Sequence, residues 1–293
     1  MSRGAALDSG TLQAVQVLRD GYRARKEELL AGLRASGAST RGIRTLLQKL
    51  SGLADDTLCQ LWLQAGFPES FALVAVGGFG RGELFPHSDI DVLVLMPDGI
   101  ALERDAQLQR KVEAFIGSCW DAGLEIGSSV RTLGDCLAMA AGDVTVQTSL
   151  LESRTIAGNR RLYGQFWKRF EAALDPQAFF VAKTLEMRQR HNKFENTPYS
   201  LEPNCKESPG GLRDLQVILW VAKAAGLGGS WEELARSGIA TPLEAQQVER
   251  NEALLGLIRA RLHAIAGRRE DRLVFDLQTA VAESFGYKST RAQ

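Results

Sequence analysis

The sequence predicts an α+β fold with a small sheet and with helical segments before and after it along the chain. Two apolar runs, Phe71–Val76 and Ile90–Leu95, have the length and the residue types of buried strands. Helical periodicity precedes them over residues 11–50 and returns from about residue 143. These patterns divide the chain into N-terminal helices over residues 1–65, a sheet domain over residues 66–142 and a helical domain over residues 143–293.

The N-terminal helices are expected to pack on the sheet domain and to supply no chemistry. Their apolar positions, such as Leu12 and Val15, follow the period of a helix, and Gly37–Thr40 interrupts the pattern. Within the sheet domain, the amphipathic segment Glu103–Trp120 predicts a helix that covers one face of the sheet. The segment Leu124–Thr132 predicts a further strand.

The composition is that of a globular protein without an overall charge that would attract a polyanion. The 293 residues include 35 Lys and Arg and 35 Asp and Glu, so we expect no nucleic-acid partner. The four cysteines are scattered without metal-ligand or paired spacing, which is typical of buried thiols in a reducing cytoplasm. Since no signal peptide or membrane-length apolar run is present, we expect a cytoplasmic protein without a membrane partner.

A glycine turn follows the first predicted strand. Gly77, Gly78 and Gly80 lack the side chains that would block close approach, so consecutive backbone N–H groups can point at an anion. Such a turn is common in proteins without any ligand. Its place between two strands, shortly before an acidic pair, indicates a turn that binds phosphate.

The acidic pair is Asp89 and Asp91, at the head of the second predicted strand. Because side chains alternate between the faces of a strand, both carboxylates project from the same face. Their mutual repulsion favours a bound cation, and carboxylate oxygens are the ligands that Mg²⁺ prefers. Ser88, directly before the pair, is a candidate to donate a hydrogen bond to a phosphate oxygen. The two features together predict metal-dependent chemistry on a nucleoside triphosphate.

The segment Gly77–Asp91 resembles the signature of the DNA polymerase β-like nucleotidyltransferase superfamily. In its full form it is similar to the family of the bacterial PII uridylyltransferase/uridylyl-removing enzymes. Besides the glycines and the acidic pair, the matching residues are Arg81, Glu83, Leu84 and Pro86. The further segments that resemble this family are Trp120–Thr132, Leu201–Asn204, Ser208–Asp214 and Glu270–Asp276.

The resemblance implies a polymerase β-like domain with a small mixed sheet, a helical N-terminal brace and a helical-bundle C-terminal domain that completes the substrate cleft. It also implies transfer of UMP from UTP to a tyrosine hydroxyl of the nitrogen-regulatory protein PII, with Mg²⁺ as cofactor. Two alternatives stay open. One is an adenylyltransferase-type modifier of proteins, and the other is a module that binds nucleotides without catalysis, against which the intact acidic pair argues.

In this superfamily a third carboxylate usually joins the acidic pair from a later strand. Glu125 is the first candidate because it alternates with Leu124 and Ile126 and therefore faces the opposite side from them. Asp143 and Asp121 are the competing candidates.

Three basic residues are candidates for nucleotide binding. Arg81 is expected to brace the glycine turn through Glu83, with phosphate contact as the alternative. Lys206 and Arg213 flank the glycines of the Ser208–Asp214 segment, at the end of a long polar loop, and loops of this length are usually functional. The acidic residues Glu202 and Asp214 are candidates to hold these two cations in place.

Two expectations concern regions beyond the nucleotide site. The chain has no His-Asp dipeptide, so we expect the hydrolase and ligand-sensing parts of the family's enzymes to be absent and the chain to be the N-terminal portion of a larger enzyme. Near the C-terminus, a cluster of arginines that includes Arg259 and Arg261 is interrupted by Glu270 and Asp271, and such mixed charge is typical of a solvated face. His263, which lies among apolar residues, is expected to be a packed histidine.

Overall fold

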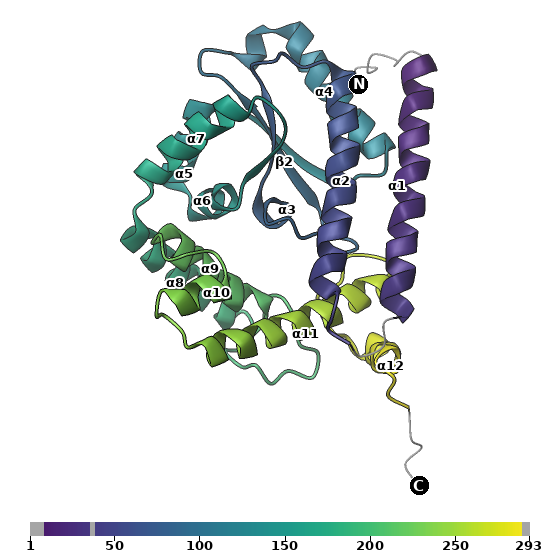
Figure 1. The fold of residues 1–293 in the computed structure, drawn as a ribbon, viewed down its shortest axis with the longest axis vertical. Coiled ribbons are helices and arrows are strands. Elements are labelled where there is room, and N and C mark those ends of the chain that lie inside the picture. Colours follow the sequence, from purple (N-terminus) through teal and green to yellow (C-terminus); the bar gives the residue numbers. More distant parts are fainter. Residues whose placement is uncertain (1–8, 36–38, 289–293) are drawn as a thin grey trace. The chain divides into compact units, whose positions relative to one another are not determined.

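The computed structural model describes residues 9–35 and 39–288, and the chain divides into two compact units (Figure 1). The first, here called the sheet unit, comprises the described residues of Met1–Leu29, Gln48–Leu84 and Ser88–Ala173. The second, the helical unit, comprises those of Leu30–Leu47, Phe85–His87 and Leu174–Gln293.

One mixed sheet of four strands lies within the described residues, in the order β3-β2-β1-β4, which confirms the α+β class. Strand β1 (Ala72–Ala75) pairs antiparallel with β2 (Ile90–Met96) and with β4 (Arg154–Gly158). Strand β3 (Ile126–Thr132) pairs parallel with β2. The mixture of parallel and antiparallel pairs is the one that the resemblance implies.

This division of the chain differs from the segments that the sequence suggests. Residues 143–173 belong to the sheet unit because β4 pairs with β1 and so completes the sheet. Helices α1 (Ser9–Ala35) and α2 (Ile43–Ala65) each contribute residues to both units instead of forming one brace. The short segment Phe85–His87 belongs to the helical unit, although both of its flanks belong to the sheet unit.

Strands β1 and β2 form the buried centre of the sheet. All four residues of β1 are buried, and Asp91 is the residue of β2 that is not fully buried. Strands that are covered on both faces read as continuous apolar runs, which is why the sequence predicts them well. The other helices of the sheet unit are α3 (Gly77–Gly80), the short 3₁₀ helix Leu102–Arg104, α4 (Ala106–Asp121), α5 (Leu133–Gly142), α6 (Val144–Leu151) and α7 (Arg160–Ala173).

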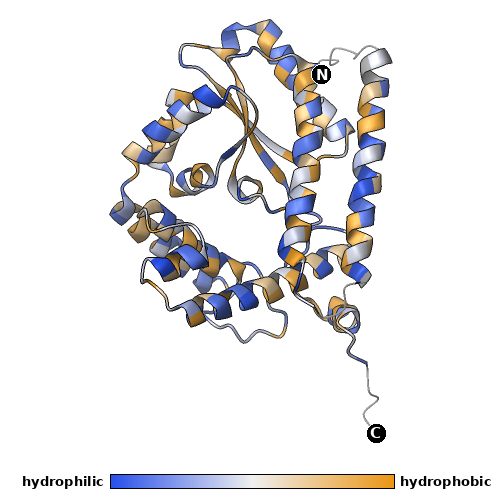
Figure 2. Ribbon diagram, in the orientation of Figure 1, coloured by the Kyte–Doolittle hydropathy of each residue, from blue (hydrophilic) through white to orange (hydrophobic). Residues whose placement is uncertain are grey.

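Helices α1 and α2 are amphipathic, and Figure 2 shows hydrophilic and hydrophobic residues alternating along them. Hydrophobic burial of one side is what stabilises such helices in a folded domain. Among the described residues, the helices all fall short of the combined length and apolarity of a transmembrane span.

The helical unit is held by apolar contacts between distant segments. Leu212, Leu257 and Ala260 pack with Ile43 and Phe85 in one buried cluster, which explains why Phe85–His87 joins this unit. The helices of this unit that follow residue 173 are α8 (Pro176–Asn192), α9 (Leu212–Ala224), α10 (Trp231–Arg236), α11 (Pro242–Ala266) and α12 (Phe275–Ser284).

A buried polar cluster also stabilises the helical unit. The Asp271 carboxylate accepts hydrogen bonds from Nε of Arg259 at 2.6 Å and from Nε2 of His263 at 3.1 Å. The backbone N–H of His87 donates to the other ring nitrogen of His263 at 3.3 Å. His263 is fully buried, as expected, but Arg259 and Arg261 are buried as well. The expectation of a solvated face is therefore wrong for these two arginines, because buried acceptors receive their hydrogen bonds.

Candidate active site

The sheet places the glycine turn and the acidic pair at the same edge. Because β1 and β2 run antiparallel, the end of β1 lies beside the start of β2, and Val76 N–H donates to the Asp91 carbonyl at 3.0 Å. The glycine turn begins at the next residue. A side chain at Gly77 would lie 3.5 Å from Oδ2 of Asp91 and 3.4 Å from Oγ of Ser149. Residues from the first turn and the second strand thus share one small space.

The glycine turn forms the four-residue helix α3, and two of its positions require glycine. Gly77 has a φ of +56°, in the left-handed region that residues with side chains rarely adopt. A Cβ at Gly80 would lie only 2.0 Å from the carbonyl oxygen of Glu152. The backbone after α6 therefore packs directly against the turn, and this close approach holds it in place.

Gly127 of β3 lies beside Asp91 and was not a candidate from sequence. The two residues are register partners in the parallel pair, and a Cβ at position 127 would lie 2.5 Å from Oδ1 of Asp91. Glycine at this position leaves the space that the carboxylate occupies. The signal in the sequence is the glycine two residues after Glu125, which has meaning only once the register between the strands is known.

The three candidates for a third carboxylate occupy different places in the sheet unit, and Glu125 is beside the start of β2, where its carbonyl accepts from Ile90 N–H at 2.9 Å. Glu125 is exposed. Its charge acts on Tyr22 of α1, whose pKa is raised to about 12, first by burial and second by Glu125. Asp143 caps α6 by accepting from the N–H groups of Thr145 and Val146, and Asp121 ends α4. Among the described residues, no three His, Cys, Asp or Glu side chains group as a metal site would require. Glu125 therefore stays a prediction, and the side chains at the sheet edge are Asp89 and Asp91.

The sequence suggests that Arg81 braces the turn through Glu83, but the structure shows another partner. Its guanidinium pairs with Glu152, whose carboxylate accepts from Nη1 at 2.5 Å and whose side chain is almost fully buried. Glu152 lies between α6 and β4, so the residue that closes this ion pair comes from the segment that also packs on Gly80. The sequence did not indicate this pair because it did not indicate β4. By pairing with β1, this strand brings the preceding residue Glu152 back to the glycine turn.

Arg154, two residues further on, was not a candidate either. Its guanidinium donates to both carboxylate oxygens of Asp55 on α2, at 2.8 and 3.0 Å, and to Oγ of Ser51 at 3.1 Å. It also donates to the carbonyl of Phe79 inside the glycine turn, at 3.2 Å. The residues 152–154 therefore connect the turn to α2, α6 and β4 within the sheet unit.

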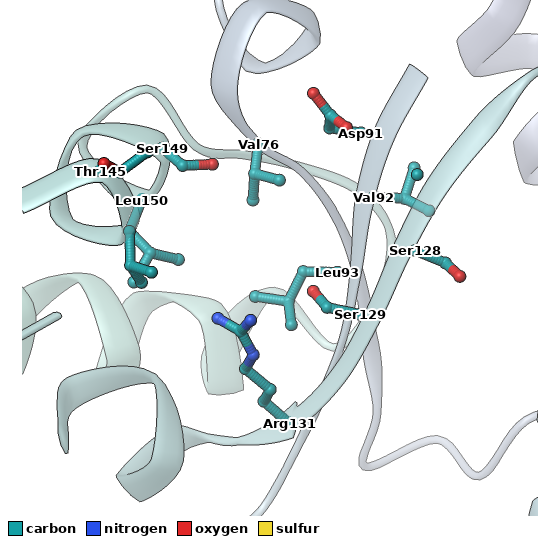
Figure 3. A pocket seen from close by; sticks show the side chains of 12 residues that line it. Val76, Asp91, Val92, Leu93, Ser128, Ser129, Arg131, Thr145, Ser149 and Leu150 are labelled. Carbon is teal, nitrogen blue, oxygen red and sulfur yellow. The ribbon is translucent and has the colours of Figure 1, made fainter. Parts of the chain in front are cut away.

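A pocket opens beside Asp91 on the same face of the sheet (Figure 3). Its volume is about 380 Å³. Asp91 and Val76 lie at one end, while the Arg131 side chain extends into it from β3 (Figure 3). The residues that line it come from β2, β3, α6 and the position directly after β1: Val76, Asp91, Val92, Leu93, Gly127, Ser128, Ser129, Arg131, Thr145, Val146, Ser149 and Leu150.

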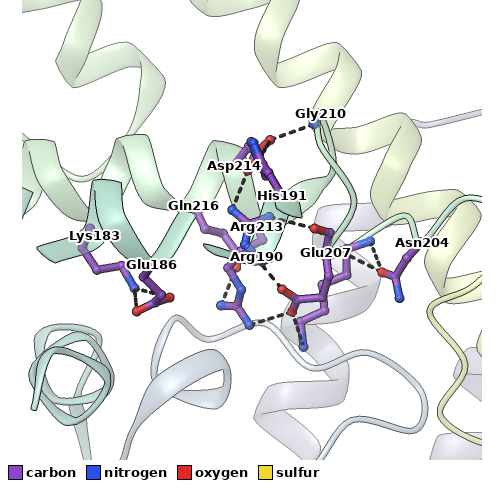
Figure 4. A network of polar contacts seen from close by, with 11 residues as sticks. Lys183, Glu186, Arg190, His191, Asn204, Glu207, Gly210, Arg213, Asp214 and Gln216 are labelled. Carbon is purple, nitrogen blue, oxygen red and sulfur yellow. Dashed lines mark hydrogen bonds and ion pairs between the residues drawn. The ribbon is translucent and has the colours of Figure 1, made fainter. Parts of the chain in front are cut away.

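Lys206 and Arg213 lie in the helical unit, where Glu207 is their common acidic neighbour. Figure 4 shows the pair of Arg213 and Glu207. Arg213 also donates to Oε1 of Gln216 at 3.0 Å. Glu207 lies 3.6 Å from Nζ of Lys206 and 3.2 Å from Nη2 of Arg213. Burial, together with the charges of Arg259 and Arg213, lowers the pKa of Lys206 to about 8.

The two acidic residues suggested for this role pair with other cations. The Asp214 carboxylate accepts from Nη2 of Arg190 at 2.6 Å and contacts Nε2 of His191 at 2.9 Å (Figure 4). Glu202 pairs with Arg272 at 3.3 Å. Glu207 is the carboxylate that pairs with Lys206 and Arg213. It lies outside the segments Leu201–Asn204 and Ser208–Asp214 and was therefore not a candidate from sequence.

A sheet with a glycine turn and an acidic pair at one edge is the arrangement that the sequence predicted for nucleotide chemistry, and the family models agree. A model described as a nucleotidyltransferase domain matches residues 55–133, and one described as GlnD PII-uridylyltransferase matches residues 178–293. The first match covers the glycine turn, the acidic pair and β3. Residues 55–133 therefore match a nucleotidyltransferase domain.

Curated relatives point to a more specific similarity. Proteins of Burkholderia pseudomallei (strain K96243) and Burkholderia mallei (strain ATCC 23344), each named bifunctional uridylyltransferase/uridylyl-removing enzyme, are 59% identical to the chain over 272 residues. The chain is therefore similar to one part of these bifunctional enzymes. The aligned part covers 93% of this chain and 31% of each relative, so the chain spans about a third of their length.

Proposed function

We propose that the chain transfers UMP from UTP to a tyrosine hydroxyl of the signal protein PII and releases pyrophosphate. The names of the relatives support uridylyl transfer, and the description of the matched family model supports PII as the acceptor. The observation that carries the proposal is the short distance between turn and acidic pair, 3.5 Å from a side-chain position at Gly77 to Oδ2 of Asp91. A phosphate held by the turn would lie beside this carboxylate.

The acidic pair fits Mg²⁺ as the cofactor. Asp89 and Asp91 would supply hard oxygen ligands, and Mg²⁺ usually takes one or two carboxylates and completes its shell with water and phosphate oxygens. Because Gly127 has no side chain, no Cβ at this position crowds Oδ1 of Asp91. Bound Mg²⁺ would neutralise charge on the triphosphate and on the pyrophosphate that leaves.

The remaining roles fall to groups of the chain itself. The backbone N–H groups of Gly77 and Gly78 and the hydroxyl of Ser88 would bind the β- and γ-phosphates. The tyrosine oxygen would bond to the α-phosphorus while the bond to pyrophosphate breaks, and the hydroxyl proton would pass to solvent. Arg81 would act mainly on the turn, because Glu152 holds its guanidinium.

Three further candidates keep the roles that the sequence predicted. Lys206 and Arg213 are proposed to bind the nucleotide, and Glu125 is proposed as the third carboxylate. Substitution of each by a neutral residue of similar size, with UTP affinity measured at several Mg²⁺ concentrations, would separate phosphate contact from metal binding.

The proposal is tested by incubating the chain with Mg²⁺, purified PII and each labelled nucleoside triphosphate in turn. Label on PII from UTP alone is expected, and both Asp89→Asn and Asp91→Asn should abolish it. Asp98→Asn is the matched control, because Asp98 is an exposed aspartate just after β2 that accepts from Gly134 N–H, an interaction that asparagine can keep. Equal labelling from ATP would refute the proposal, and so would full activity in both Asp89→Asn and Asp91→Asn.

A further inference from the structure

We infer that the pocket beside Asp91 receives the acceptor side chain, and that Ser129 and Arg131 of β3 contact the acceptor segment. This inference rests on the proposed function, because it assumes that a nucleotide occupies the glycine turn. It assigns the pocket to the acceptor tyrosine, whose hydroxyl attacks the α-phosphorus, and not to the nucleoside of UTP.

The first support is the direction in which the pocket extends. Asp91 and Leu93 point to the same face of β2, and their register partners Gly127 and Ser129 lie beside them on β3. Arg131 follows on the same face, four residues beyond the partner of Asp91, which corresponds to about 13 Å along the strand. The glycine turn lies at the opposite end, where β2 begins. The pocket therefore extends from Asp91 away from the turn.

The second support is the geometry of phosphoryl-type transfer. The attacking oxygen and the leaving oxygen lie roughly in line on opposite sides of the phosphorus. If the glycine turn holds the β- and γ-phosphates, pyrophosphate leaves on the side of the turn. The attacking hydroxyl must then approach from the side of Leu93 and Ser129, which is where the pocket is.

The third support is the chemistry of the lining. Leu93, Val146 and Leu150 offer apolar surface for an aromatic ring. Ser129 and Thr145 add hydroxyl groups to the lining (Figure 3). At the far end, the Arg131 guanidinium forms no ion pair within 4.0 Å with a carboxylate of the described residues. It is a fixed cation whose N–H groups are available to carbonyl or carboxylate oxygens of the acceptor segment.

The test fills the pocket and separates the two substrates. Thr145→Trp places a large side chain on the exposed first turn of α6, and the Asp143 cap survives because it uses backbone N–H groups. Gln147→Trp is the matched control, since Gln147 is on the same helix and does not line the pocket. The measurements are the Kd for Mg²⁺–UTP, the KM and kcat for transfer to PII, and PII binding in the presence of a UTP analogue with a methylene bridge between the α- and β-phosphorus.

Thr145→Trp is expected to lower kcat/KM for PII by about 10- to 100-fold, a range typical of a pocket that no longer fits its group, with Kd for Mg²⁺–UTP changed less than about twofold. Arg131→Ala should raise KM for PII more than it lowers kcat. A rise in the Kd for UTP with Thr145→Trp would overturn the inference, because the pocket would then hold the nucleoside. So would unchanged PII binding in that variant, or no PII binding by the unsubstituted chain. If PII binds and is not labelled, the proposed function fails and the binding result still decides the inference.

Discussion

Arg154 holds the residue Phe79 by two contacts: its Nη2 donates to the Phe79 carbonyl at 3.2 Å, and its guanidinium lies 5.0 Å from the centroid of the Phe79 ring. The same guanidinium is anchored by the carboxylate of Asp55. A central peptide of the glycine turn is therefore fixed to α2 through one side chain of β4. Contacts of this kind keep the N–H groups of a binding turn in position before the ligand arrives.

Replacing Arg154 should weaken both the fold and the nucleotide site. Arg154→Ala is expected to lower the free energy of unfolding by about 2 kcal/mol, because it removes charge-assisted hydrogen bonds and leaves Asp55 without its partner. Arg154→Lys should recover part of the stability and little of the UTP affinity, since lysine cannot form the bidentate contact. Urea unfolding and the Kd for Mg²⁺–UTP measure the two effects.

The control for Arg154 is Arg169→Ala, which breaks the exposed pair between Arg169 and Asp98. That change should alter stability by less than about 1 kcal/mol. Similar losses for both arginines would contradict a special role for Arg154.

Gly80→Ala should disrupt the glycine turn, because a Cβ there meets the backbone oxygen of Glu152 at 2.0 Å, and backbone, unlike a flexible side chain, cannot turn away. We expect a loss of about 2 kcal/mol in the free energy of unfolding, as for other overpacked sites, together with weaker UTP binding. Gly117→Ala is the control: nothing lies within 4 Å of its Cβ, and it is inside α4. It should increase stability by about 0.5–1 kcal/mol. Equal effects of the two changes would refute the close packing at Gly80.

Gly127→Ala should damage catalysis more than stability. The added Cβ would meet Oδ1 of Asp91 at 2.5 Å, and that flexible carboxylate can rotate away, but it then leaves the position proposed for metal binding. The expected result is a higher Mg²⁺ concentration for half-maximal UMP transfer, with a melting temperature close to that of the unsubstituted chain. Gly164→Ala on α7, where a Cβ meets nothing within 4 Å, should leave the Mg²⁺ dependence unchanged. An unchanged Mg²⁺ dependence in Gly127→Ala would separate Asp91 from the metal.

Lys206 should make stability depend on pH in the alkaline range. Burial lowers its pKa from 10.5 to about 8, so between these values the unfolded chain binds the proton that the folded chain has released. Stability therefore rises with pH from about 8 to about 10.5, and the cost of burying the charge is fully present below pH 8. Lys206→Met should stabilise the chain at pH 7 by up to about 3 kcal/mol, and the gain should shrink toward pH 10.5.

The measurement for Lys206 is the difference in unfolding free energy between the two proteins at a series of pH values. Lys49→Met, at an exposed lysine of α2, is the control for loss of a lysine without burial. A constant difference for Lys206→Met would mean that the ammonium group is not desolvated.

The strands next to the site were predictable because their signals are local. Phe71–Val76 and Ile90–Leu95 are continuous apolar runs, and the observed strands Ala72–Ala75 and Ile90–Met96 agree with them closely. Strand β4 was not predicted, because Arg154–Gly158 is short and has neither alternation nor an apolar run. It is a strand because β1 offers a free edge with which its backbone can pair. The domain boundaries suggested by the sequence differ from the observed units for the same reason.

The sequence by itself determined the candidate residues for the chemistry: the glycine turn and the acidic pair lie within residues 77–91, and the strands that hold them follow from local apolarity. Only the tertiary structure decided which charges meet. Arg81 pairs with Glu152, 71 residues away, instead of with Glu83, and Glu207 serves Lys206 and Arg213 in place of Glu202 and Asp214. Local periodicity carries no information on such pairs, because they depend on how distant segments return to the sheet and to the helical unit.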